Sequence, residues 1–251
     1  MAVGFDAKST SPTATTSPTR QTSHSHTNLT VGSGANRGLV FGFAWEDINP
    51  GPITACNWDN GGTPQAMTAI VSPTAASDGT YVALYGLVNP TAGNKTLFIS
   101  WTNSAELIAC GIAFTGVDQT GGATTFAHAT TNASTGAGSA ALPANPTITI
   151  TSATGNYTVA IAQVGHSAHP TSPTQTSWFG VDGNNANNPA GSYAAGAATV
   201  THAFTISPTN PWIMAGVDIV AAGGGGKASK NTRSAPLGMN QGEAMGIQGE
   251  Q

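Results

Sequence analysis

The sequence predicts an all-β protein, either a sandwich or a barrel, and three observations carry that prediction. Residues that favour helices are scarce, since Glu and Lys each occur only four times among 251 residues. Thr, Val and Ile recur in short bursts, which is typical of strands. Gly, Pro, Asn and Asp separate these bursts at the short spacing of a β-sandwich.

Charge is sparse and unevenly distributed. Charged residues make up 7% of the chain, against about 25% in an ordinary soluble domain. Residues 31–222 hold two basic and eight acidic residues, a net charge of −6, whereas each flank carries +1. Because binding to phosphates requires clustered Lys and Arg, this distribution predicts no nucleic-acid partner.

Targeting signals are absent from the sequence pattern. No apolar run approaches the roughly 18 to 20 residues that a bilayer span requires, so no membrane span is predicted. The first residues lack the basic end and apolar stretch of a secretory signal. Either the protein does not use that route or a leader has been removed.

Composition divides the chain into three segments. Residues 1–30 are rich in Ser, Thr and Pro, which predicts an N-terminal arm or an edge strand. Residues 31–222 carry the apolar bursts and predict a β-sandwich domain that is large enough for a core. Residues 223–251 begin with four glycines and have almost no aliphatic content, so we expect a Gly-rich extended C-terminal arm that does not fold alone.

Turns with their own chemistry separate the strands expected in residues 31–222. They occupy residues 59–62, 89–90, 92–94 and 184–189. Pro90 ends a strand because it lacks an amide donor, and Gly93 permits a positive φ, so we expect a hairpin between the strands on either side. The expected strands cover residues 39–45, 53–58, 65–71, 81–88, 95–101, 106–114, 147–151, 157–164, 176–181, 199–206 and 212–221.

Four stretches of the chain resemble one known family. They are the run YVALYGLVNPTAGNKTLFISW, the run IACGIAFTGVDQTG, the pair Asn36-Arg37 before an apolar strand, and the segment from Trp58 to Met67. Together they are similar to a jelly-roll-like β-sandwich family found in phage structural proteins and in bacterial surface proteins. The resemblance covers residues 28–221. It implies a jelly-roll-like antiparallel β-sandwich, here with extended N- and C-terminal arms.

The same resemblance implies a non-enzymatic virion structural protein. The leading hypothesis is a bacteriophage capsid decoration protein or tail component that assembles in the host cytoplasm and resides in the virion. Its expected partners are copies of itself, as a homo-oligomer, and a major capsid or tail protein, bound through the arms. The C-terminal arm offers five side chains for this contact, namely Lys227, Lys230, Arg233, Leu237 and Met239.

The alternative hypothesis is a carbohydrate-binding module of an extracellular or cell-surface protein. Such a module stacks sugars on exposed aromatic side chains. Most Trp and Tyr residues lie inside apolar runs, where packing in the core is expected. Trp178 and Tyr193 flank the polar segment DGNNANNPAG, so we expect these two to be exposed and to contact surface glycans.

No pattern in the sequence predicts a catalytic residue, a metal ligand or a cofactor. The run GHSAH at 165–169 resembles a nucleophile elbow, but Pro170 and Pro173 prevent the helix that must follow. The histidines of that run lack a third ligand at metal spacing, and so do His24 and His26, which would share one face of a strand. We therefore expect no enzyme, and a hydrolase site assembled from distant residues is the least favoured hypothesis.

Two cysteines, Cys56 and Cys110, both lie in expected strands and can face each other across the core. A disulfide between them would stabilise the fold by roughly 4 kcal/mol. Two reduced thiols in the core fit a reducing cytoplasm equally well. Both readings stay open at the level of sequence.

Overall fold

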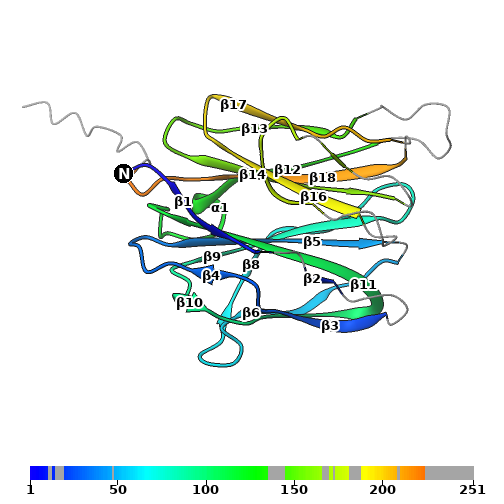
Figure 1. The fold of residues 1–251 in the computed structure, drawn as a ribbon, viewed down its shortest axis with the longest axis horizontal. Helices are drawn as coiled ribbons and strands as arrows, with labels where there is room; N and C mark the ends of the chain where they lie inside the picture. Colours follow the sequence, from blue (N-terminus) through cyan, green and yellow to red (C-terminus); the bar gives the residue numbers. More distant parts are fainter. Residues whose placement is uncertain are drawn as a thin grey trace, which may run out of the picture.

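A computed structural model of the chain has an all-β antiparallel sandwich fold, as the sequence predicts. Its strands stack in layers (Figure 1). Among the described residues, no helix is both long and apolar enough to cross a membrane. The structure describes residues 1–10, 13–14, 20–46, 48–134, 145–165, 170–171, 173–180, 188–207 and 210–223.

The larger sheet has nine strands and forms two of the layers. It follows the order β7-β6-β11-β5-β9-β8, with β1, β2 and β3 added along β11. Its strands are β1 (Gly4–Lys8), β2 (Thr13–Ala14), β3 (Gln21–His26), β5 (Gly38–Glu46), β6 (Ile53–Trp58), β7 (Gln65–Ala66), β8 (Thr68–Ala75), β9 (Tyr81–Val88) and β11 (Leu97–Thr115). The short pair β4 (Thr30–Val31) and β10 (Gly93–Asn94) lies beside it.

A five-stranded sheet packs on the flat part of the larger sheet, and a strand pair covers its far face (Figure 1). The sheet follows the order β12-β18-β14-β16-β15. Its strands are β12 (Phe126–Ala133), β14 (Tyr157–Val164), β15 (Thr176–Gly180), β16 (Asn188–Ala195) and β18 (Trp212–Ile219). The short helix α1 (Gly122–Thr125) precedes β12, and the covering pair is β13 (Thr147–Thr151) and β17 (Thr199–Ala203).

Three apolar cores separate the layers. The upper core lies under β13 and β17 and contains Ile150, Phe204 and Met214. The middle core joins the two sheets. The lower core fills the concave side of the larger sheet, where aromatic residues of β5 meet Trp58 and Trp101. The larger sheet therefore faces an apolar core on both sides. Its concave face is buried because the sheet curls over itself.

The curvature comes from β11, which is one strand where the sequence predicts two. Its two halves pair with different neighbours: residues 106–114 with β5, and residues 98–101 with β6. Between the halves, the polar residues 102–104 are exposed. Leu97, Ile99 and Trp101 face the lower core. The expected strand pattern is thus present, but the chain bends through it without a break.

The hairpin expected across residues 89–96 is wrong. β9 pairs with β5 and β8, and β5 lies between β9 and β11. Residues 38–45 of β5 are all buried, so this strand takes the central place that two-sided burial requires. The turn chemistry itself is confirmed, because φ is +100° at Gly93 and +48° at Asn89.

Two strands, β12 and β16, lie where the sequence predicts none. β16 has the sequence NPAGSYAA and pairs with both β14 and β15. Its small residues are typical of loops, yet they fit a strand covered on both faces. Gly191 shows the constraint: a Cβ there would lie 1.0 Å from Nε1 of Trp178.

Candidate functional site

Three turns of the chain meet at one end of the sandwich, around Arg37. Its Nε donates to the carbonyl of Pro90 at 2.8 Å, its Nη1 to Gly34 at 2.9 Å, and its Nη2 to Oδ1 of Asn89 at 3.0 Å. Gln119 adds a bond from its side-chain amide to the carbonyl of Arg37. Three guanidinium nitrogens are thus engaged in holding turns.

Gln65 links the same turns to β6. Its Oε1 accepts from the amide and the hydroxyl of Thr91, at 2.6 and 2.9 Å, and its amide donates to the carbonyl of Asn89. The indole of Trp58 donates to the carbonyl of Thr91 at 2.9 Å. These bonds join the turns and β6 into one end of the fold.

The first residues of the chain connect the two sheets. β1 pairs with β11 of the larger sheet, but the amide of Val3 donates to the carbonyl of Gly155 at 2.7 Å. Nζ of Lys8 donates to the carbonyl of Ser177 at 2.9 Å, and the terminal amine of Met1 to that of Ala222 at 3.0 Å. We call residues 1–26 the N-terminal arm.

The N-terminal arm follows one edge of β11 along most of its length. β1 pairs with residues 112–115, β2 with 108–109, and β3 with 97–100 and with Ala105. Among the described residues of the arm, only Val3, Ser9 and His26 are buried. Backbone hydrogen bonds therefore form most of this attachment.

Aromatic rings add a second contact between the arm and the five-stranded sheet. Phe5 stacks on Tyr193 with 5.1 Å between ring centroids and 15° between ring planes, and Tyr193 stacks on Tyr157 at 6.3 Å. Phe5 is 40% exposed, whereas Tyr193 is half-buried. Burial raises the pKa of Tyr193. Phe5 was missed in the sequence because its segment contains no apolar run.

Trp178, expected to be exposed, is buried between the sheets with 1% of its surface accessible. Its ring lies over Gly191 on one side and approaches Gly42 of β5 on the other. Two glycines on different strands leave the space for this indole. The expectation failed because the polar neighbours of Trp178 in the sequence say nothing about what faces it across the sandwich.

The two cysteines are free thiols and do not form the disulfide that was one of the two expectations. Cys56 belongs to the lower core and Cys110 to the middle core, so they lie on opposite faces of the larger sheet. Burial raises the pKa of both thiols, that of Cys110 to about 12. Buried neutral thiols behave as small apolar side chains here.

His24 and His26 lie on one face of β3, as the sequence predicts. They are register partners of Ile99 and Leu97, which face the lower core. Nε2 of His26 lies 2.8 Å from Oγ of Ser9, which accepts the amide of Gly111. Burial, aided by the neighbouring His24, lowers the pKa of His26 to about 4. The imidazole of His26 therefore helps to attach the arm to the lower core, where it also meets the ring of Phe41.

A second buried histidine holds the upper core. Nε2 of His202 lies 2.9 Å from Oγ1 of Thr158, and its Nδ1 lies 2.7 Å from Oγ of Ser192. All three side chains are inaccessible to solvent, and burial lowers the pKa of His202 to about 4. A neutral imidazole with one donor and one acceptor nitrogen satisfies both hydroxyls.

Asp218 is buried nearby and is satisfied by neutral donors. Ser152 donates to its Oδ1 at 2.6 Å and Asn156 to its Oδ2 at 2.8 Å. Burial raises the pKa of Asp218 in spite of these bonds. The carboxyl therefore fixes the turn between β13 and β14 to the end of β18.

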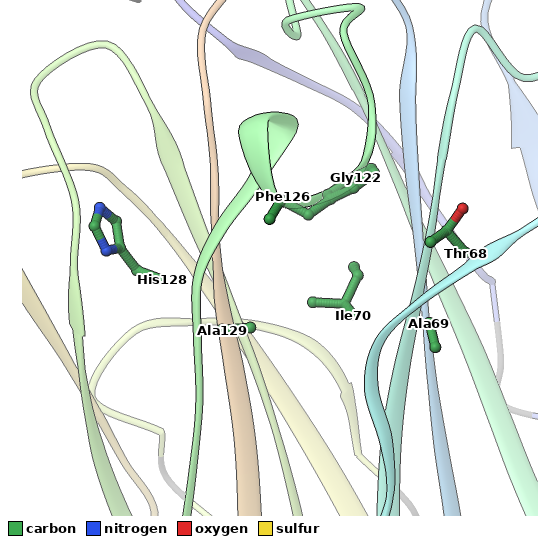
Figure 2. Close-up of a pocket in the computed structure, with 8 residues that line it drawn as sticks. Thr68, Ala69, Ile70, Gly122, Phe126, His128 and Ala129 are labelled. Carbon is green, nitrogen blue, oxygen red and sulfur yellow. The ribbon is translucent and has the colours of Figure 1, made fainter.

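Three surface hollows are lined by described residues. The first, of about 120 Å³, lies between β8 and the α1–β12 segment, and Figure 2 shows Ile70 and Phe126 beside it while His128 points away. The second, of about 250 Å³, lies between β12 and β13. The third, of about 390 Å³, lies between β6 and the junction of β7 with β8. We call it the seam groove; it is lined by residues 53–57, Ala66, Met67 and Tyr85.

Several predicted positions lie outside the described residues. These are the GHSAH run from His166 onwards and the arm residues Lys227, Lys230, Arg233, Leu237 and Met239. Within the described part of the chain, no three His, Cys, Asp or Glu side chains gather at metal-binding distance. Comparison with family models, with curated proteins and with solved structures found no match.

Proposed function

We propose that this chain is a non-enzymatic structural protein of a virion, a capsid decoration or tail component that binds its neighbours by adding extended segments to sheet edges. One observation carries the proposal: the N-terminal arm adds three successive strands to a single edge of β11. The family resemblance of residues 28–221 supplies the virion setting. Copies of the chain and a major capsid or tail protein are the proposed partners.

Strand addition suits such binding because backbone pairing tolerates many different sequences. A backbone ladder can form with any extended segment that has free amides and carbonyls, and side chains at alternate positions then set specificity. The arm attaches mostly in this way, since few of its described side chains are buried. A segment contributed by a neighbour can use the same chemistry at another open edge.

The proposal is tested on purified particles from cells that make the protein. Mass spectrometry should find the chain at a fixed ratio to the major capsid or tail protein, and electron microscopy should place it at a repeated position. A purified monomer that no particle contains would contradict the proposal.

Removal of residues 224–251 tests the role of the C-terminal arm in that setting. We expect the shortened chain to keep its unfolding transition and to occupy fewer particle sites. Unchanged occupancy would show that the C-terminal arm does not bind neighbours.

A glycan-binding role is the second candidate, and the exposure of Phe5 over Tyr193 favours it. A flat, partly exposed aromatic pair offers a stacking surface for a sugar ring. Phe5→Ala should then abolish signals on a glycan array, while Thr201→Ala on the opposite layer should not. An array without signals for the unaltered chain would exclude this role.

A further inference from the structure

The seam groove is an open side of the lower core. The strands β6 and β8 lie next to the short β7 but belong to different parts of the sheet. β6 pairs with β11, whereas β8 pairs with β9. The last bond across the seam runs from the amide of Met67 to the carbonyl of Cys56, at 2.8 Å. Beyond this bond, β6 and β8 have no backbone hydrogen bond to each other among the described residues, and the groove opens beside β6.

One edge of β6 lacks a strand partner along the groove. β7 pairs with Asn57 and Trp58, and Met67 binds Cys56, which leaves residues 53–55 without a strand on that side in the described part of the chain. The facing strand is a poorer template, because β8 contains Pro73 and its pairing register shifts twice. Pro and bulges are devices that block pairing at an edge. An added strand would therefore pair with β6.

The groove has no charged residue in its lining, which combines polar residues such as Thr54 and Asn57 with an apolar part. Cys56, Met67 and Tyr85 belong to the lower core, and Ile53 packs against it. Cys56 remains 6% exposed and Met67 7%. Burial and the neighbouring Cys56 raise the pKa of Tyr85 to about 12, which agrees with this apolar setting. An occupant needs apolar side chains at alternate positions and no charge between them.

The C-terminal segment contains such a pattern. Leu237 and Met239 are two residues apart, so in a strand they share one face. The nearest charged residues are Arg233 and Glu243, at the two ends of the run SAPLGMNQG. Twenty-eight residues follow Gly223, and when extended they span about 90 Å, which is ample to reach a neighbouring molecule.

We propose that the segment 237–240 of a neighbouring copy adds a strand to the free edge of β6, with Leu237 and Met239 filling the seam groove. The choice of a neighbouring copy rests on the proposed function. The added strand pairs with residues 53–55 and extends the lower core over its open side. Each copy then carries one donor segment and one acceptor groove, which links copies head to tail.

A disulfide trap in the full-length chain tests the contact, because the groove contains a native thiol. Met239→Cys should form a disulfide with Cys56 under a mild oxidant and give dimers and longer chains on a non-reducing gel. The same substitution combined with Cys56→Ser should stay monomeric. A cross-linked monomer would mean that the segment folds back on its own molecule, and no cross-link would overturn the groove as its site.

Protection of the native thiol provides a test without introduced cysteines. In concentrated full-length protein, alkylation of Cys56 should accelerate on the order of tenfold after Leu237→Asp with Met239→Asp, and also on dilution. Gly238→Asp with Asn240→Asp is the matched control, since it adds the same charge on the opposite strand face. Equal rates for the two double variants, or no effect of dilution, would contradict the inference.

The outcomes separate this inference from the proposed function. If particle occupancy depends on residues 224–251 but Cys56 never joins position 239, the groove is wrong and the virion role stands. If the cross-link forms but no particle contains the chain, the virion role is wrong and the head-to-tail contact stands.

Discussion

The two sheets solve the same problem, the burial of a second face, in different ways. The five-stranded sheet receives a separate cover, β13 and β17, and a buried histidine ties that cover down through Thr158 and Ser192. The larger sheet curls over itself around the lower core and leaves the seam groove open. Both faces of the covered sheet are buried within one chain. The curled sheet instead leaves part of the β6 edge open, where another strand can pair.

The largest expected effect is at Trp178, which lies over Gly191 of its own sheet and approaches Gly42 of the larger sheet. Gly191→Val places side-chain atoms inside the space of the indole, so we expect a loss of about 4 kcal/mol or more in the free energy of unfolding. Chemical unfolding followed by Trp fluorescence measures it. Gly61→Val is the control, because a Cβ at Gly61 meets nothing within 4 Å. Equal unfolding midpoints would show that Trp178 is not held between the sheets.

Acid should weaken both regions through their buried histidines. His26 and His202 have pKa values of about 4 in the folded chain and an ordinary value of 6.5. Because the unfolded chain binds these protons more readily, the free energy of unfolding should rise between about pH 4 and 6.5 and level off above. Each histidine contributes on the order of 3 kcal/mol. Asp218, whose pKa is raised, acts in the opposite direction.

Denaturant unfolding between pH 4 and 7 measures this dependence. His26→Asn should remove the part of the pH dependence that comes from the N-terminal arm. His202→Asn should remove the part that comes from the covering strands β13 and β17, so the two variants compare the two regions. A flat profile for the unaltered chain would contradict the burial of neutral imidazoles.

A smaller effect is expected where the arm meets the five-stranded sheet. Phe5→Ala removes the stacking on Tyr193, which is worth about 1 kcal/mol. Hydrogen exchange of the amides in β1 should accelerate, while exchange in β14 stays unchanged. Lys8→Met is a useful control because it keeps the length of a neighbouring side chain and removes only the bond to Ser177. Unaltered exchange in β1 would show that the ring contact does not hold the arm.

The sequence predicts the strands that contain enough apolar residues of their own to be recognised. The expected ranges for β5, β9 and β14 agree with the structure to within a residue, because continuous apolar runs suit strands buried on both faces. The range expected for β6 agrees as well, although β6 is only partly buried. The φ of Gly93 was also predictable from its turn. These features depend on local chemistry.

The rest depends on what lies opposite in space. β16 is a strand because Trp178 needs Gly191 beneath it, and no local signal in NPAGSYAA shows that. The strands of the N-terminal arm exist because β11 offers them an edge. The seam groove arises where β6 and β8 separate, and a sequence does not record the absence of a partner.

Hydrogen exchange of the amides in residues 53–55, measured in dilute and in concentrated full-length protein, tests the central claim most directly. The account predicts slower exchange on concentration at β6, with no change in β14 and β18 of the covered sheet. Exchange at β6 that is independent of concentration would contradict the claim that a neighbouring copy completes the curled sheet.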